Sequence, residues 1–421
     1  MARTSTRNES PTVAVVLSGA AARGAFQAGA LAALMPELER RGERPSILLG
    51  TSAGAINAAL WGANAHLPSA DAADGLVELW SEMGADDVYE PISRSVWPLG
   101  VRFLLGSTMR VGGGTTSLLD TGPLRDTAGR RFDAERLHAN VVDASVGIDA
   151  VGVVATRVPP GEERRDEGMA SGRSVLFLDE RVPSGYVGDP AHAHDVVASE
   201  IGPEHVVASA AIPVAFPAQR IDTPESAAGW YVDGGVRLNA PLRHAIGLGA
   251  DRIILVSAAS TEHGPPFASA DPSRRPDMAY AGAQALHAVL SDRMIEDLHA
   301  IRRMNHLVEQ VEQAAPSGGL QELRRRGSKD VYRRVEFMRV SPPPGAMGML
   351  AGQLSGERAD LHGAAADSDN FLLARAVRGA GDAKGYRELM SYLLFDEEYF
   401  QESIRIGRDA ACKALLRGWE H

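Results

Sequence analysis

One serine in the sequence stands in a pattern that can carry nucleophilic chemistry. Ser52 lies at the centre of Gly50-Thr51-Ser52-Ala53-Gly54, which has the G-x-S-x-G form of a nucleophile elbow. In such an elbow a sharp turn between a strand and a helix lifts the serine hydroxyl above the end of a sheet. A glycine at each end of the motif lets two backbone segments pass close together, where a Cβ would clash. The pattern therefore predicts a serine nucleophile at position 52.

A loop of small residues nearer the N-terminus could bind an anion. Residues 18–24 read Ser-Gly-Ala-Ala-Ala-Arg-Gly, between an apolar run at 13–17 and a helical pattern at 25–41. Backbone N–H groups at the start of a helix point outward and can hold a negative charge. Neither the G-x-G-x-x-G pattern nor the Walker A pattern matches, which argues against a nucleotide loop. Two interpretations stay open: an oxyanion hole that serves Ser52, or a tight turn that needs small residues.

These groups require secondary structure to hold them in place. Short apolar runs predict buried parallel strands, and spacings of three and four residues predict helices. Strands are predicted at 13–17, 47–49, 146–156, 174–178, 230–232, 252–257 and 335–340, and helices at 25–41, 55–61, 71–80, 239–248 and 278–311. The Gly- and Ala-rich stretch 345–385 is predicted to be loosely ordered. Alternating strands and helices indicate an α/β fold.

The loop and the elbow, in this order, resemble the patatin-like phospholipase family, the bacterial branch in particular. In that family a loop with a consensus like G-G-G-x-R/K-G follows the first strand and supplies the oxyanion hole. The resemblance implies an oxyanion hole made by Gly19, Ala20, Ala21, Ala22, Arg23 and Gly24. Two family glycines are alanines here, and alanine adopts a positive φ with difficulty. We expect a distorted, weaker hole if the loop needs such a conformation at either alanine.

The resemblance also implies the partner of Ser52. The family carries its catalytic aspartate in a D-G-G/A motif, which Asp233-Gly234-Gly235 matches, 181 residues after Ser52. The implied chemistry is hydrolysis of acyl esters of lipids, by a phospholipase A, a lysophospholipase or a general esterase. Ser52 attacks the carbonyl, Asp233 takes its proton, and an acyl-enzyme forms without metal or cofactor. Partial burial would raise the pKa of Asp233 toward the working range.

The resemblance further implies a three-layer α/β/α fold with a mainly parallel central sheet and a helical C-terminal extension. We expect a flexible tail at 1–10, a catalytic domain at 11–260 and a mostly helical region at 261–421 packed on the same domain. Residues 71–130 are expected to include a cap insertion. Within it, Val96–Leu105 suits either insertion at a lipid interface or packing on the core.

Three alternative functions stay open. Ser52, Asp233 and His263 follow the order of an α/β-hydrolase triad, so the enzyme could use a histidine. Ala20 and Ala21 motivate a weak or inactive lipid-binding homologue. A transacylase would use the same acyl-enzyme with an alcohol in place of water.

Composition limits the classes of partner. The chain has 421 residues, 44% hydrophobic and 23% charged, with a net charge of -11, as in soluble globular proteins. The negative charge and 5% aromatic content argue against nucleic-acid binding. The sequence has one cysteine and no apolar run of membrane-spanning length. We expect a cytoplasmic protein with a lipid or acyl-ester substrate and, at most, peripheral membrane contact. The histidines and aspartate at 192–195 are interpreted as a surface loop and not as a metal site.

Overall fold

The computed structural model describes residues 11–88, 122–159, 172–213, 215–261, 278–314, 333–361 and 383–421. The segment Val96–Leu105 and His263, which the sequence singled out, lie outside these ranges.

A ten-stranded, mostly parallel sheet forms the centre of the protein, in the order β10-β9-β1-β2-β3-β4-β6-β5, with β8 and β7 attached at β3. The pairs β10–β9, β9–β1, β1–β2, β2–β3 and β4–β6 are parallel. The strands are β1 (Val13–Leu17), β2 (Ile47–Thr51), β3 (Ala150–Arg157), β4 (Arg173–Glu180), β5 (Gly188–Asp189), β6 (His194–Ala198), β7 (Gln219–Ile221), β8 (Gly229–Asp233), β9 (Arg252–Val256) and β10 (Glu336–Val340).

Helices cover both faces of the sheet, and short 3-10 turns join several strands to them. The α-helices are α1 (Gly24–Arg40), α2 (Ala53–Asn64), α3 (Ser69–Glu82), α5 (Gly122–Arg131), α6 (Ala134–Val142), α8 (Pro203–Ser209), α9 (Leu242–Gly247), α10 (Met278–His287), α11 (Arg293–Ala314), α13 (Ala346–Leu361), α15 (Ala383–Leu393) and α16 (Glu397–Arg417). The 3-10 turns are η1 (Ala21–Arg23), η2 (Ala85–Asp87), η3 (Pro190–His192), η4 (Glu225–Ala227) and η5 (Gly234–Val236), and η6 (Ala288–Asp292) is a π-helical turn.

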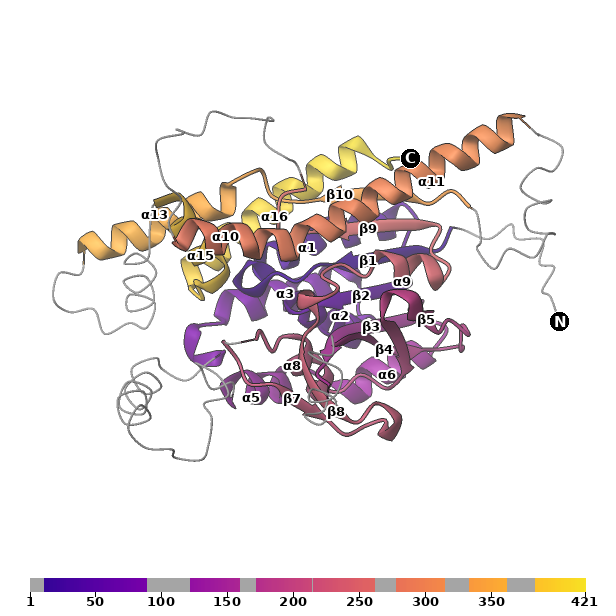
Figure 1. Ribbon diagram of the computed structural model, residues 1–421, viewed down its shortest axis with the longest axis horizontal. Coiled ribbons are helices and arrows are strands. Elements are labelled where there is room, and N and C mark those ends of the chain that lie inside the picture. Colours follow the sequence, from indigo (N-terminus) through magenta and orange to yellow (C-terminus); the bar gives the residue numbers. More distant parts are fainter. Residues whose placement is uncertain are drawn as a thin grey trace.

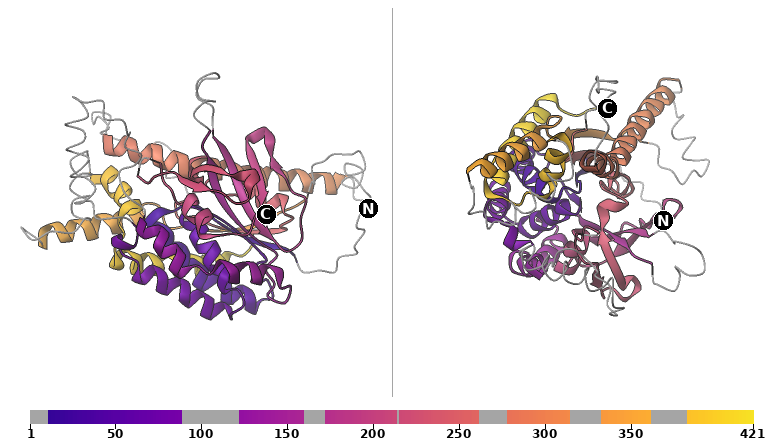
Figure 2. Two further views of the ribbon diagram at one scale, coloured as in Figure 1. Left: turned by 90° about the horizontal axis from the view of Figure 1, so that it is seen from below. Right: turned by 60° about the vertical axis from the view of Figure 1, so that its left-hand side comes forward.

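The side chains of β1 show why the fold has three layers. Val13, Val15 and Leu17 enter the core beneath α1, α2, α3 and α16, whereas Ala14 and Val16 enter the core beneath α9 and α11. A strand that is buried on both faces is apolar at every position, as the sequence of β1 is. The views in Figures 1 and 2 show the N-terminal helices on one face of the sheet and α10 and α11 on the other. The predicted three-layer α/β/α fold with a helical C-terminal region is confirmed.

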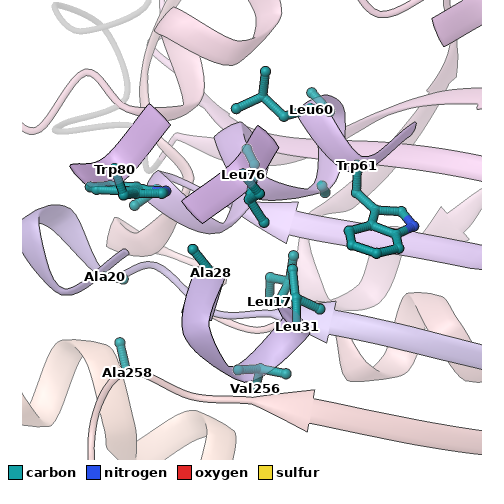
Figure 3. Packing of buried hydrophobic residues seen from close by; sticks show 14 of the residues in the cluster. Leu17, Ala20, Ala28, Leu31, Leu60, Trp61, Leu76, Trp80, Val256 and Ala258 are labelled. Atoms are coloured by element: carbon teal, nitrogen blue, oxygen red, sulfur yellow. The ribbon is translucent and has the colours of Figure 1, made fainter. Parts of the chain in front are cut away.

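The core beneath α1, α2, α3 and α16 includes the end of β1 and the loop that follows it. Leu17, Ala28 and Leu31 pack together below Leu76 of α3, and Ala20 lies near Trp80 (Figure 3). This core therefore supports the loop that was expected to hold an anion.

The first part of the stretch predicted to be loosely ordered, 345–385, instead forms helix α13, whereas residues 362–382 lie outside the described ranges. Glycines in this helix allow close contact with α15: a Cβ on Gly352 would lie 2.4 Å from Cγ of Arg387, and one on Gly348 would lie 2.7 Å from an Oε of Glu388. Small residues that suggested mobility therefore serve helix packing. The surface-loop interpretation of 192–195 is also wrong for His194, which begins β6 and is buried.

Helix α16 packs on α1 through glycines at the crossing. A Cβ on Gly29 would lie 2.0 Å from the carbonyl oxygen of Ile404, and a Cβ on Gly407 would lie 2.0 Å from that of Phe26. The two backbones are therefore in direct contact, which no larger residue permits. The C-terminal helix is an integral part of the core and closes over α1.

We predict that Gly29→Ala and Gly407→Ala each lower the free energy of unfolding by about 3 kcal/mol, because the helices must move apart. Gly75→Ala is the matched control: Gly75 is exposed on α3, with no atom within 4 Å of its Cβ position. That change should raise stability by up to about 1 kcal/mol through helix propensity. Chemical denaturation of the three variants measures the difference, and equal effects at all three positions would contradict the close crossing.

Candidate active site

Ser52 occupies a strained turn between β2 and α2. Its backbone has φ 56° and ψ -127°, a conformation that residues with a Cβ rarely adopt. A Cβ on Gly50 would lie 2.2 Å from the carbonyl oxygen of Gly54, and one on Gly54 would lie 2.4 Å from that of Leu17. The two glycines of the motif thus permit backbone-to-backbone contact on both sides of the serine. The N-terminus of α2 below Ser52 favours negative charge above it.

Strand register brings Asp233 to Ser52. Strand β2 runs along one edge of β3 and ends with Thr51 opposite Val154. Strand β8 runs antiparallel along the same edge and ends with Asp233 opposite Ala155, the next residue of β3. The two strands therefore meet end to end, and the residues at the junction are Ser52 and Asp233. The Ser52 hydroxyl lies close enough to the Asp233 carboxylate to lower the pKa of that group.

Asp233 is buried, and its environment raises the pKa of its carboxyl group. It is 5% exposed, and burial raises its pKa from 3.8 to about 6, against the opposing effect of hydrogen bonds from Ser52 and the Gly235 N–H. The Gly235 N–H donates to Asp233 Oδ1 at 2.6 Å and holds the carboxylate in place. At neutral pH this group is ionised and yet more basic than an ordinary aspartate.

Ser209 fixes the elbow from behind. The Ser52 N–H donates to Ser209 Oγ at 2.8 Å, and that hydroxyl donates to the carbonyl oxygen of Val154 at 2.5 Å. Ser209 is fully buried at the end of α8. It links the strained turn to β3, next to the position where Asp233 pairs.

The loop of small residues lies directly beside Ser52. A Cβ on Gly19 would lie 3.4 Å from the Cβ of Ser52. Three of the six predicted donors already donate to main-chain carbonyls: the N–H of Gly19 to Asn239, that of Arg23 to Ala20, and that of Gly24 to Ala21. The remaining N–H groups, those of Ala20, Ala21 and Ala22, find no acceptor in the described part of the chain.

The two unusual alanines differ in conformation. Ala21 has φ 47°, in the left-handed region that favours glycine, whereas Ala20 has φ -144°, which any residue adopts. The loop therefore needs a positive φ at one of the two positions where the family consensus has glycine, and alanine occupies it at a cost of about 1 kcal/mol. The methyl group does not prevent the loop from reaching this conformation.

Arg23 anchors the loop to the C-terminal helices. Its side chain is 2% exposed, so it is not available to a lipid phosphate. The guanidinium donates to Glu388 Oε1 at 2.6 Å, to Tyr392 Oη at 2.9 Å and to Ser391 Oγ, all on α15, and stacks on the ring of Tyr392 at 3.8 Å. It also donates to the carbonyl oxygen of Ala258, after β9. These contacts show that Arg23 holds the loop in place.

A buried polar network supports the same loop from the side of α2. Asn57 Nδ2 donates to the carbonyl oxygen of Gly24 and to Gln27 Oε1, each at 3.1 Å. Trp80 Nε1 donates to Asn57 Oδ1 at 2.7 Å, and Gln27 Nε2 donates to the carbonyl oxygen of Ser18 at 2.8 Å. Every member has a partner, so the network makes the positions of β1, α1, α2 and α3 mutually dependent.

An apolar groove leads away from Ser52. The groove beside the serine is lined by Ser52, Ala21 and mostly apolar side chains such as Trp80 and Phe216. A second apolar cavity extends to Phe132. The two cavities have four lining residues in common: Ile56, Met83, Leu124 and Ala210. Together they form one apolar path that begins at the serine.

Sequence reasoning located Ser52, Asp233 and the loop, but missed the residues that hold them. Ser209, Asn57 and Glu388 were not singled out, because each acts through a partner far away in the chain. The described residues contain no group of acidic, histidine and cysteine side chains that could hold a metal ion. Within the same ranges, no helix has the length and apolar character that a membrane crossing requires.

We predict opposite effects for the two loop alanines. Ala21→Gly should raise the free energy of unfolding by up to about 1 kcal/mol, because it removes the strain of φ 47°. Ala20→Gly should lower it by about 0.5–1 kcal/mol, because it only adds freedom to the unfolded chain. Chemical denaturation tests this, and equal signs for the two variants would contradict the backbone conformation of the loop.

Two solved structures match this chain with low TM-scores and low sequence identity. The structure is similar to VipD from Legionella pneumophila, with a TM-score of 0.30 and 11% identity over 98% of this chain and 68% of that chain. It is also similar to human GIVD cytosolic phospholipase A2, with a TM-score of 0.32 and 13% identity over 96% of this chain and 62% of that chain. No curated protein sequence matches the chain.

The family model described as Patatin-like phospholipase matches residues 15–246, which include the loop after β1, the elbow and the Asp-Gly-Gly turn. The match does not specify a bacterial branch. Because it spans more than half of the chain, the protein belongs to the patatin-like phospholipase family.

Proposed function

We propose that the protein is a serine hydrolase that cleaves acyl esters of lipids through a Ser52–Asp233 dyad. The observation that carries this proposal is the end-to-end meeting of β2 and β8 on β3, which pairs a strained serine with a buried aspartate. A buried carboxylate with a raised pKa lowers the stability of the fold when it is ionised. Such groups concentrate at functional sites.

The geometry supports a two-step reaction. Ser52 Oγ attacks the ester carbonyl carbon while its proton passes to Asp233, and the alcohol leaves with that proton. The negative charge on the carbonyl oxygen is stabilised by the N–H groups of Ala20 and Ala21 and, at the start of α2, by that of Ala53. Water then hydrolyses the acyl-enzyme. Each donor is held by the backbone, so no reorganisation is needed when the charge develops.

The apolar path from Ser52 toward Phe132 supports a substrate with a long acyl chain. Alkyl groups gain about 0.8 kcal/mol per buried CH₂, so a chain that continues into the second cavity binds more tightly than a short one. The substrate class we propose is therefore a lipid or another long-chain acyl ester, with any membrane contact peripheral.

We predict that Ser52→Ala lowers kcat/KM on p-nitrophenyl esters by on the order of 10⁴-fold or more, and Asp233→Asn by about 10²–10⁴-fold. The wild-type kcat/KM should rise with pH to a plateau, with a midpoint of about 6, because only the ionised Asp233 can accept the proton. Labelling of Ser52 by a fluorophosphonate should follow the same curve. Activity that Asp233→Asn leaves near normal would show that the base is another group.

Two controls separate chemistry from folding. Burial raises the pKa of Asp233 in the folded state, so the ionised form destabilises the fold as pH rises from about 4 to about 6. Asp233→Asn should therefore unfold at higher denaturant concentration than wild type at pH 8, and the advantage should disappear below pH 4. His263→Ala should leave turnover unchanged, and a large loss there would favour the α/β-hydrolase alternative.

We predict that Ala128→Phe, which fills the second cavity, lowers the ratio of kcat/KM for dodecanoyl over butanoyl esters by about tenfold or more. The exposed Asp126 lies two residues earlier on α5, so Asp126→Phe adds the same ring outside the cavity and should leave the ratio unchanged. Steady-state kinetics on the two esters checks this. An unchanged ratio in Ala128→Phe would exclude the second cavity as the acyl site.

A further inference from the structure

Asn239 borders the dyad from the side of the small-residue loop. It is 4% exposed, and its main-chain carbonyl accepts the Gly19 N–H at 3.1 Å. Its Nδ2 donates to the carbonyl oxygen of Leu290, in the π-helical turn, at 2.6 Å. Because a carbonyl can only accept, this contact fixes the orientation of the amide. The amide nitrogen faces Leu290, and the amide oxygen points away from Leu290.

Two glycines locate that oxygen. A Cβ on Gly19 would lie 2.3 Å from Asn239 Oδ1 and 3.4 Å from the Cβ of Ser52. A Cβ on Gly235 would lie 3.0 Å from both Asn239 Oδ1 and Asp233 Oδ1. The amide oxygen therefore lies beside both Ser52 and Asp233.

The amide oxygen accepts no hydrogen bond from any residue that the structure describes. A buried acceptor without a donor costs about 1–3 kcal/mol. The neighbouring groups cannot supply the donor: the Gly19 N–H is bonded to the main chain, and an ionised Asp233 can only accept. A water molecule or a substrate group that reached this oxygen would supply the missing donor next to the catalytic pair.

We infer that Asn239 positions the water molecule that hydrolyses the acyl-enzyme, an inference that rests on the proposed function. One O–H of the water donates to Asn239 Oδ1 and the other to the Asp233 carboxylate. The water oxygen attacks the acyl carbonyl carbon as its proton passes to Asp233. The bond from that carbon to Ser52 Oγ then breaks, and Oγ takes the proton from Asp233. The products are the free carboxylic acid and regenerated Ser52.

This role separates the two halves of the reaction. Acylation of Ser52 uses the ester and Asp233 and needs no water, whereas deacylation requires the bound water. Loss of the amide oxygen should therefore slow the second half alone. It should also favour an added alcohol over water, because the alcohol no longer competes with a well-positioned nucleophile.

The experiment uses the full chain and compares wild type, Asn239→Ala and Asn239→Ser in stopped-flow hydrolysis of a p-nitrophenyl ester, with and without methanol. We expect Asn239→Ala to keep the p-nitrophenol burst and fluorophosphonate labelling, while steady-state turnover falls about tenfold, as for one lost hydrogen bond. Methanol should restore turnover and yield the methyl ester. Asn239→Ser, which retains a short hydroxyl acceptor, should recover part of the hydrolytic rate.

Leu290→Ala is the structural control, because it loosens the π-helical turn and leaves the amide oxygen intact. If it reproduces the effect of Asn239→Ala, or if burst and turnover fall together in Asn239→Ala, the amide acts through packing and the inference is overturned. Unchanged turnover in Asn239→Ala overturns it as well. A wild-type chain that shows neither burst nor labelling would instead refute the proposed function, so the two failures are distinguishable.

Discussion

The site depends on one strained backbone conformation, that of Ser52. A residue with a Cβ at φ 56° and ψ -127° costs on the order of 1–3 kcal/mol, and the surrounding structure must hold it there. Gly50 and Gly54 allow the backbone to close around the turn, and Ser209 ties its N–H to β3. The same strand holds Asp233 one residue further along. Ser52 and Asp233 therefore lie together because β2 and β8 share one edge of β3.

The sequence alone was sufficient to predict the elements whose structure depends on their own composition and on neighbouring residues. Strands such as β1 and β9 are buried on both faces, so their composition predicts them, and the spacing of Gly50 and Gly54 predicts the elbow. The pairing of β8 with β3 could not be derived in this way, because it depends on contacts between segments far apart in sequence. The family resemblance supplied Asp233 instead. Ser209 and Asn239 were missed as partners because an isolated serine or asparagine carries no pattern, and α13 was missed because its glycines serve packing against α15.

The loop next to Ser52 shows how a departure from a family consensus can be interpreted once φ values are known. The replacement of two glycines by alanine suggested a distorted hole, but the two positions are not equivalent. Ala20 occupies an ordinary conformation and Ala21 a left-handed one, so only one of the substitutions strains the chain. Arg23 and the Asn57 network hold the loop on opposite sides, and their contacts are sufficient to offset about 1 kcal/mol of strain.

The anchoring of Arg23 has a consequence for the order in which the protein is made. The partners of its guanidinium on α15 lie some 365 residues later in the chain, at Glu388, Ser391 and Tyr392. During translation the elbow, β8 and the whole matched family segment emerge from the ribosome before these partners exist. Until then Arg23 lacks its partners on α15, and the small-residue loop lacks this anchor. The loop beside Ser52 should therefore reach its anchored position only after helix α15 has been synthesised.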